Sequence, residues 1–234
     1  MDPIQAKVYE ILTKKRFCRD APSRRPQLQG IIALAIRKGH PIPLVGFWGI
    51  GGKTRTSESD EACCEFLCSL RSQVQAVYPP GIRFMFIFAT QHAVFNGYRE
   101  DSIASYMGSV KSLFGKYVFE WVSLDGLWQK YGITLKLVDS IVASRPKAWW
   151  SRVRNHELLE KSASKRSKKK DSKEAAMRYY IFRRLESPML QTEFKGWVFH
   201  TFSEAQLKNV LPSMPTLYLY ATGKGRSESP WFIE

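Results

Sequence analysis

A cationic, glycine-rich loop is the first feature of this sequence that can do chemistry. Residues 49–55 follow a short apolar run and read Gly-Ile-Gly-Gly-Lys-Thr-Arg. Glycines let backbone amides approach a ligand closely, and amides beside lysine and arginine bind phosphate or carboxylate groups. The alternative is a flexible turn with solvated cations. We predict Lys53 as a catalytic residue of this loop, and as substrate-binding residues Gly49, Gly51, Gly52, Thr54 and Arg55.

The same loop departs from the P-loop of nucleotide triphosphatases. That motif requires four residues between its first glycine and the Gly-Lys pair, whereas Gly46 precedes Gly52 by one residue too many. Residues 56–59 are predicted as loop rather than as the start of a helix, and neither later strand ends in an aspartate for magnesium. Nucleotide triphosphate hydrolysis is therefore not expected.

A second group of polar side chains follows the next predicted strand. His92, Gln91 and Asn96 come after it, and ligands of α/β sheets bind at the carboxyl ends of strands, so we expect these residues to face the same cleft as Lys53. The alternative for His92 is an ordinary surface or core histidine. The predicted catalytic set also includes Tyr180 and Glu186, whose alternatives are a core position and an ion pair with Arg183.

Positive charge is concentrated late in the chain. Of the net charge of +15, residues 145–184 contribute +10, from fourteen Lys or Arg against four acidic residues. Such a surplus favours an anionic partner, and interleaved aromatic residues such as Trp149, Trp150, Tyr179 and Tyr180 are typical of RNA-binding surfaces. A solvated charge run and contact with anionic lipid are the alternatives. The predicted RNA-binding residues are Arg145, Lys147, Arg152, Arg154, Lys165, Arg166, Lys168, Lys169, Lys170 and Lys173.

Strands and helices are expected to alternate around these residues. Apolar runs at 41–48 and 82–89 predict buried strands, and the helical spacing over 62–77, with Ser59 or Asp60 as N-cap, predicts a helix between them. A helix from Asp101 to Phe114, a strand over 117–122 and a helix capped by Ser123 repeat the pattern. Two basic helices joined at 161–170 and strands at 196–200 and 216–221 complete the chain. We therefore predict a single α/β domain over 1–234, Rossmann-like, with a mostly parallel sheet, helices on both faces and a basic helical segment at 145–186.

Composition limits the class of protein. The hydrophobic content of 44% supports a continuous core, and no apolar run reaches the roughly 20 residues that cross a bilayer. Because the first residues also lack the pattern of a signal peptide, we predict a cytoplasmic protein that does not contact membranes. Four cysteines, at 18, 63, 64 and 68, lack a nearby histidine and paired spacing, which indicates buried thiols rather than a zinc site. No metal or cofactor is predicted.

Three short motifs resemble the isocyanide-synthase family of pyoverdine and dityrosine biosynthesis. They are Tyr78-Pro-Pro-Gly81, Asp101-x4-Tyr106 and Ser229-Pro-Trp231, in the family's order and over most of the chain. Where that family has F-P-x-K-S this chain has Ile50-Gly-Gly-Lys53-Thr54, and S-D-G-x-x-F and T-P-W-H are also altered. The resemblance implies that Lys53 acts on a pentulose phosphate together with an amino acid.

The organisation of the chain is similar to that of tRNA-dependent cyclodipeptide synthases. These enzymes share its length, a core akin to class I aminoacyl-tRNA synthetases and a basic helical patch for tRNA. Their Tyr-Ile-x-x-Glu motif resembles Tyr180-Ile181 followed by Glu186, with two extra residues, whereas Trp48 occupies the place of their nucleophilic serine. The resemblance implies that aminoacyl-tRNA is the partner and that a cyclic dipeptide is the product.

Three functions remain open, and the concentrated charge favours the second resemblance. A polyanionic tRNA gives that charge an immediate use, whereas a small sugar phosphate does not. We therefore expect a tRNA-dependent, amide-forming aminoacyltransferase. The alternatives are an isocyanide-synthase-like enzyme and a non-catalytic RNA-binding module.

Overall fold

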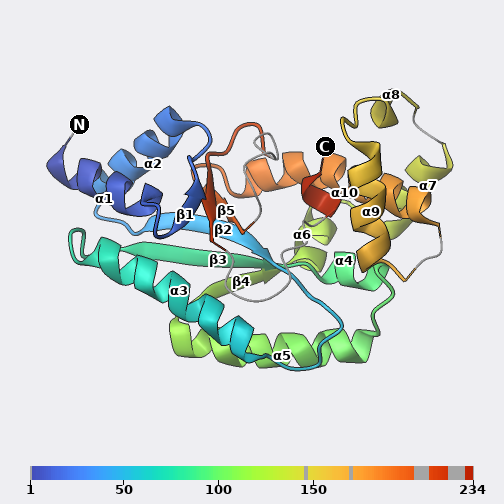
Figure 1. The fold of residues 1–234 in the computed structure, drawn as a ribbon, viewed down its shortest axis with the longest axis horizontal. Coiled ribbons are helices and arrows are strands. Elements are labelled where there is room, and N and C mark those ends of the chain that lie inside the picture. Colours follow the sequence, from blue (N-terminus) through green and yellow to red (C-terminus); the bar gives the residue numbers. More distant parts are fainter. Residues whose placement is uncertain (1, 145–146, 169–170, 203–210, 221–229, 234) are drawn as a thin grey trace.

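One mixed sheet organises the chain in the computed structural model, which describes residues 2–144, 147–168, 171–202, 211–220 and 230–233 (Figure 1). Its strand order is β1-β6-β5-β2-β3-β4. Neighbouring strands are parallel except β1, which pairs antiparallel with β6. The strands are β1 (Cys18–Asp20), β2 (Ile42–Trp48), β3 (Ile82–Phe88), β4 (Glu120–Ser123), β5 (Val198–Thr201) and β6 (Thr216–Leu219).

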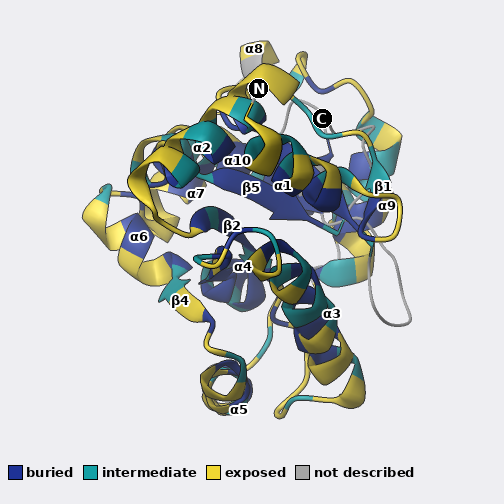
Figure 2. Ribbon diagram, turned by 90° about the vertical axis from the view of Figure 1, so that its left-hand side faces the viewer, coloured by how far each residue is buried: buried dark blue, intermediate teal, exposed yellow. Residues whose placement is uncertain are grey.

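Helices pack against both faces of this sheet (Figure 2). Side chains alternate along each strand, so that Leu44 joins a core cluster with α1, α2, α3 and α5, while Val45 joins a second cluster with α6, α7, α9 and α10. The helical elements are α1 (Pro3–Thr13), α2 (Arg25–Lys38), α3 (Glu58–Gln75), α4 (Thr90–Phe95), α5 (Glu100–Tyr117), α6 (Leu124–Lys130), α7 (Leu135–Ala143), α8 (Lys147–Trp150), α9 (His156–Arg166), α10 (Ser172–Glu193) and the 3₁₀ turn η2 (Pro230–Phe232). The predicted Rossmann-like α/β fold, with helices on both faces of a mostly parallel sheet, is confirmed.

The strand order reverses at β2. From β2 the chain adds β3 and then β4 on one side, and after α10 it returns to add β5 on the other side of β2. The loops that leave β2 and β5 at their carboxyl ends therefore diverge, which in open α/β sheets creates the place where ligands bind. We call this side of the sheet the carboxyl edge.

The predicted unit of strand, helix and strand is confirmed, but its helix begins earlier than expected. The N-cap is Ser57, whose side chain and that of Asp60 each accept a hydrogen bond from the other's backbone N–H. Residues 56 and 57 precede the helix, as predicted, but this reciprocal capping box makes 58 and 59 helical. The prediction of loop at 58 and 59 and the choice of Ser59 or Asp60 as N-cap were therefore wrong.

Two other boundaries also differ from the prediction. Helix α5 is capped by Arg99 instead of Asp101 and continues through Tyr117, until Val118 adopts a left-handed conformation with φ of 54°. The strand predicted from 117 therefore starts only at Glu120. The predicted cap of α6 is confirmed, since Ser123 Oγ accepts a hydrogen bond from the Gly126 amide. Residue 221, predicted to end the last strand, lies outside the described residues.

The cysteines lie in or against the core. Cys18, Cys63 and Cys64 are buried and Cys68 is half-buried, and all four are free thiols, as predicted. Burial raises the pKa of Cys18 to about 12, and burial likewise raises the pKa of Cys64 and Cys68. Across the described residues, no group of three or more His, Cys, Asp or Glu is arranged to hold a metal ion. None of the helices in the described ranges is both long and apolar enough to cross a bilayer.

Candidate functional site

The glycine-rich loop leaves β2 at the carboxyl edge, and its second half is fixed to α5. Ser105 Oγ donates a hydrogen bond to the Thr54 carbonyl at 2.9 Å, and the Thr56 amide donates to Ser109 Oγ at 2.9 Å. The two serines are four residues apart and so lie on one face of α5. The downstream part of the loop is therefore anchored, which argues against a freely flexible turn.

Lys53 is held by a hydrogen-bonded chain that we call the loop network. Its Nζ lies 3.1 Å from Asp60 Oδ2, Asp60 Oδ1 accepts from the Tyr106 hydroxyl at 2.8 Å, and that hydroxyl accepts from Trp48 Nε1 at 3.2 Å. Burial by itself raises the pKa of Asp60, but hydrogen bonds from Ser57, Tyr106 and Lys53 outweigh it and lower that pKa below its usual value. Asp60 therefore stays ionised and orients Lys53, whose side chain is 45% exposed and accessible to a ligand.

A second chain of polar groups, the α10 network, is centred on Glu186. Its carboxylate is 0% exposed, and each of its oxygens lies 3.0 Å from His92 Nε2. Trp128 Nε1 donates to Oε1 at 2.9 Å, and Trp231 Nε1 donates to Oε2. The His92 ring stacks on Phe182 with centroids 5.4 Å apart. Four sequence-distant segments thus meet at one buried carboxylate, which fixes the orientation of His92.

The expectation that His92 and Lys53 share one cleft was wrong, because the two networks lie on opposite faces of the sheet. Phe47 and Trp48 are adjacent in β2 and point to opposite faces. The Phe47 ring lies 5.8 Å from His92 and 5.1 Å from Trp231, whereas Trp48 belongs to the loop network. The histidine and the lysine therefore belong to networks that are anchored on different faces of the sheet.

Other residues of the predicted site have structural partners. Asn96 Oδ1 accepts from the buried Tyr179 hydroxyl at 2.7 Å, and Gln91 Nε2 donates to Asp125 at 3.0 Å. Tyr180 is buried in α10 with its ring 6.3 Å from Trp150. The predicted stacking surfaces at Tyr179 and Tyr180 are therefore core, because both rings face inward from α10.

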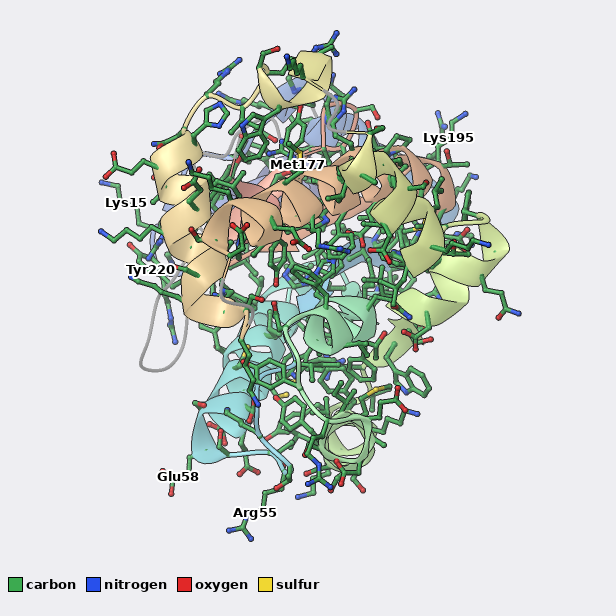
Figure 3. The ribbon with its side chains drawn as sticks, turned by 90° about the vertical axis from the view of Figure 1, so that its right-hand side faces the viewer. Lys15, Arg55, Glu58, Met177, Lys195 and Tyr220 are labelled. Carbon is green, nitrogen blue, oxygen red and sulfur yellow. The ribbon has the colours of Figure 1, made fainter. Side chains whose placement is uncertain are left out.

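The basic segment lies beside the glycine-rich loop. The Lys168 amide donates to the Asn96 carbonyl at 3.1 Å, and its ammonium lies 5.5 Å from the Tyr98 ring centroid. Tyr98 in turn packs against Gly52, where an added Cβ would lie 3.0 Å from Tyr98 Cε1. One aromatic ring thus connects the basic segment to the residue before Lys53. Arg55, at the end of the loop, projects outward from the molecule (Figure 3).

The remaining predicted cations differ in exposure. Arg166 is half-buried, and its charge acts on the buried Tyr179. Arg145, Lys169 and Lys170 lie outside the described residues. The exposed members of the predicted RNA-binding set are Lys147, Arg152, Arg154, Lys165, Lys168 and Lys173.

Asp60, Tyr106, Trp128 and Trp231 were not among the predicted site residues. Two of them stand in motifs that the sequence did show, since Tyr106 ends Asp101-x4-Tyr106 and Trp231 ends Ser229-Pro-Trp231. Asp60 carried the signal of a capping residue. No signal in the sequence marked Trp128, because an indole on an apolar helix face usually belongs to the core.

A groove of about 440 Å³ lies at the other end of the sheet. It is lined by Ile31 and Leu34 of α2, by Trp197 before β5 and by Met214 and Pro215 before β6. These positions precede the strands, so the groove is distant from the carboxyl edge, where ligands of such sheets bind.

The fold and the loop together define a Rossmann-like α/β domain with a glycine-rich, cationic loop at its carboxyl edge. No protein-family model and no curated protein sequence matches the chain. Among solved structures, the PvcA protein from Pseudomonas aeruginosa is similar with a TM-score of 0.64 and 13% identity, covering 98% of this chain and 87% of that one. Tyrosyl-tRNA synthetase from Archaeoglobus fulgidus, solved with L-tyrosine, is similar with a TM-score of 0.51 and 14% identity, covering 93% of this chain and 63% of that one. Both resemblances suggested by the sequence are confirmed as resemblances of fold.

Proposed function

We propose that this protein is a biosynthetic enzyme that takes aminoacyl groups from tRNA and joins them into a cyclic dipeptide. The observation that carries the proposal is the contact of Lys168 with Tyr98 and of Tyr98 with Gly52, which puts the basic segment beside the loop that bears Lys53. A polyanion held by α9 and its following residues then brings its end to the anion-binding loop. The similarity in fold to a tyrosyl-tRNA synthetase supports the same substrate class.

The reaction needs no further source of energy, because an aminoacyl ester is already activated. The amine of one aminoacyl group attacks the ester carbonyl of the other, a C–N bond forms, the ester C–O bond breaks, and the RNA 3′ oxygen leaves with the proton that the amine gives up. The free amine of the resulting dipeptidyl ester then attacks its own ester carbonyl, closes the ring and releases the second RNA. Each step requires a cation or amides near the developing oxyanion and a group that moves a proton.

In this proposal, Lys53 and the loop amides bind the end of the RNA and the developing negative charge. Asp60 is a positioning residue, because it holds Lys53 through the loop network. Since Glu186 has no exposed surface and holds His92 by Nε2, its role is to position that histidine rather than to touch the substrate amine. Tyr180 is proposed to support the same region through α10.

Incubation with charged tRNAs and mass spectrometry of small products tests this function. The wild-type protein is expected to release cyclic dipeptides and uncharged tRNA. Replacement Lys53→Ala is expected to lower kcat/KM about 10- to 100-fold, the effect of losing one charged hydrogen bond. Lys116→Ala, which removes an exposed lysine of α5, serves as the control and is expected to leave turnover unchanged. The absence of any cyclic dipeptide from a mixture of all aminoacyl-tRNAs would refute the proposal.

The second candidate is an isocyanide-synthase-like enzyme, and the similarity to PvcA favours it. That match covers more of both chains than the match to the synthetase. In addition, Tyr106 and Trp231 end two of the three motifs that resemble that family, and Lys53 stands at the lysine of its F-P-x-K-S segment. Lys53 and Tyr106 belong to the loop network, and Trp231 belongs to the α10 network. Turnover of an amino acid with ribulose phosphate that disappears in Lys53→Ala would support this candidate. RNA affinity without turnover of either substrate would leave a non-catalytic RNA-binding module.

A further inference from the structure

A second surplus of positive charge lies at the start of the chain. Residues 1–40 contain nine Lys or Arg against three acidic residues, a net charge of +6. Three consecutive cations, Lys14, Lys15 and Arg16, follow the end of α1, and all three are exposed. In the described part of the chain they form no ion pair, and the Arg16 guanidinium lies 5.6 Å from the Phe17 ring centroid. We call these three residues the α1 cluster.

The sheet places the α1 cluster at the carboxyl edge. Strand β1 runs antiparallel to β6 with Cys18 opposite Leu219, the last residue of β6, and the Tyr220 amide donates to the Phe17 carbonyl at 2.9 Å. The residues immediately before β1 therefore lie where β6 ends. The glycine-rich loop and Lys168 lie at the same edge, where β2 and β3 end.

The α1 cluster and α9 also share one side of the molecule. Viewed along the longest axis, Lys15 and α9 lie on the same side, whereas Lys195 lies on the other (Figure 3). Figure 1, at right angles to that axis, shows α1 and β1 toward one end of the molecule and α9 toward the other, with β2 and β3 between them. Three strand spacings separate β6 from β3, about 14 Å across the sheet, so an RNA that contacts both flanks must extend over at least about four nucleotides at about 3.4 Å each.

The chemistry of this side favours a nucleic acid over a membrane. Stable binding to a bilayer needs apolar side chains to insert beside the cations. The large apolar side chains that are exposed in the described residues belong to α1, α2, α7 and the region of β4, and none lies in the α1 cluster or in α9. Cations without large exposed apolar side chains beside them, on both flanks of an amide-lined loop, fit a phosphate backbone.

We propose that the α1 cluster is a second RNA contact, so that one RNA is held on both flanks of the carboxyl edge with its 3′ end at the glycine-rich loop. The inference rests on the proposed function and extends it. The contact at α9 holds the RNA near β3, and Lys14, Lys15 and Arg16 hold phosphates of the same molecule near β6. The contacts are electrostatic and carry no sequence preference.

Fluorescence anisotropy with a labelled RNA hairpin tests the proposal. The probe is a stem of about 12 base pairs, near one helical turn, with a short single-stranded 3′ extension, titrated at several salt concentrations. The triple variant Lys14→Ala, Lys15→Ala, Arg16→Ala is expected to weaken binding at least about tenfold at physiological salt. The slope of log affinity against log salt concentration is expected to be smaller in magnitude by about 2 in this variant than in wild type, because three phosphate contacts are lost.

A matched control removes the same charge from the opposite edge of the sheet. Arg37→Ala, Lys38→Ala, Lys195→Ala takes two cations from the end of α2 and one from the turn before β5, and it is expected to change affinity less than about twofold. Circular dichroism of each variant checks that the fold is kept.

The α9 variant Lys165→Ala, Lys168→Ala separates the two hypotheses. If it loses RNA while the α1-cluster variant behaves like the control, the second contact is refuted and the proposed RNA site stands. If neither variant differs from the control, RNA binding at this edge fails altogether, and the inference fails with it. Wild-type binding to phosphatidylserine vesicles that the α1-cluster variant loses, with an unchanged RNA salt slope, would assign the cluster to membranes and overturn the inference.

Discussion

Replacing Glu186 by alanine is expected to lower the free energy of unfolding by about 3–5 kcal/mol, the cost of removing one partner from a buried charged network. The carboxylate is the common acceptor for Trp128, Trp231 and His92. Its removal leaves two indole N–H groups and one imidazole nitrogen without their acceptor in the core, together with a cavity. Urea denaturation followed by circular dichroism measures the change.

A glutamate of the same helix provides the control. Glu174 pairs with Arg178 one turn along α10, and its side chain is 41% exposed. Because Glu174 itself is partly exposed and Arg178 keeps Asp139 as a second partner, Glu174→Ala is expected to cost less than about 1 kcal/mol. Equal losses in the two variants would contradict the central role of Glu186. Glu186→Gln is expected to fall between them, because an amide accepts from one indole but turns its own donors toward the other groups.

The second large effect is expected from His200: the free energy of unfolding should decrease as the pH falls, because this side chain is buried in its neutral form. This side chain is fully buried in β5, and neither ring nitrogen has a hydrogen-bond partner within the described residues. It packs between Phe84, Phe86 and Gly46, where an added Cβ would lie 2.6 Å from His200 Cε1. Burial lowers the pKa of His200 to about 3, so the folded protein keeps the ring neutral while an unfolded chain protonates it near pH 6.5.

The direction of the change in stability with pH follows from this difference in proton uptake. The unfolded state binds the extra proton at any pH between about 3 and 6.5, so the contribution to stability is complete above that window and is lost as pH falls through it, at about 1.4 kcal/mol per pH unit. Between pH 8 and pH 4.5 the loss is about 2.7 kcal/mol. His200→Leu removes the titrating group, so its stability relative to wild type is expected to rise by that amount over the same interval.

The variant must be compared with wild type because carboxylates also contribute to acid unfolding. His40→Gln alters an exposed histidine and is expected to leave the pH profile unchanged. Parallel profiles of wild type and His200→Leu, in urea denaturation at five or so pH values, would show that His200 finds a partner or a proton in the folded state.

Much of the fold follows from local patterns in the sequence. The apolar runs at 41–48 and 82–89 became β2 and β3 because continuous apolar strands are stable only when both faces are covered. The helix ends were less predictable. The start of α3 depends on a reciprocal bond between Ser57 and Asp60, and the end of α5 depends on Val118 adopting a left-handed conformation.

The sequence by itself determined the alternation of strands and helices, the buried thiols, the excess of positive charge and the loop of amides and cations after the first long strand. These are properties of composition and of short-range periodicity. Only the tertiary structure decided that His92 pairs with Glu186, 94 residues away, and that Lys53 pairs with Asp60 on the other face of the sheet. It alone placed Lys168 beside Tyr98 and the cations after α1 at the same edge. The reason is physical: strand pleat and strand order assign each side chain to a face and an edge, and neither is set by spacing along the chain.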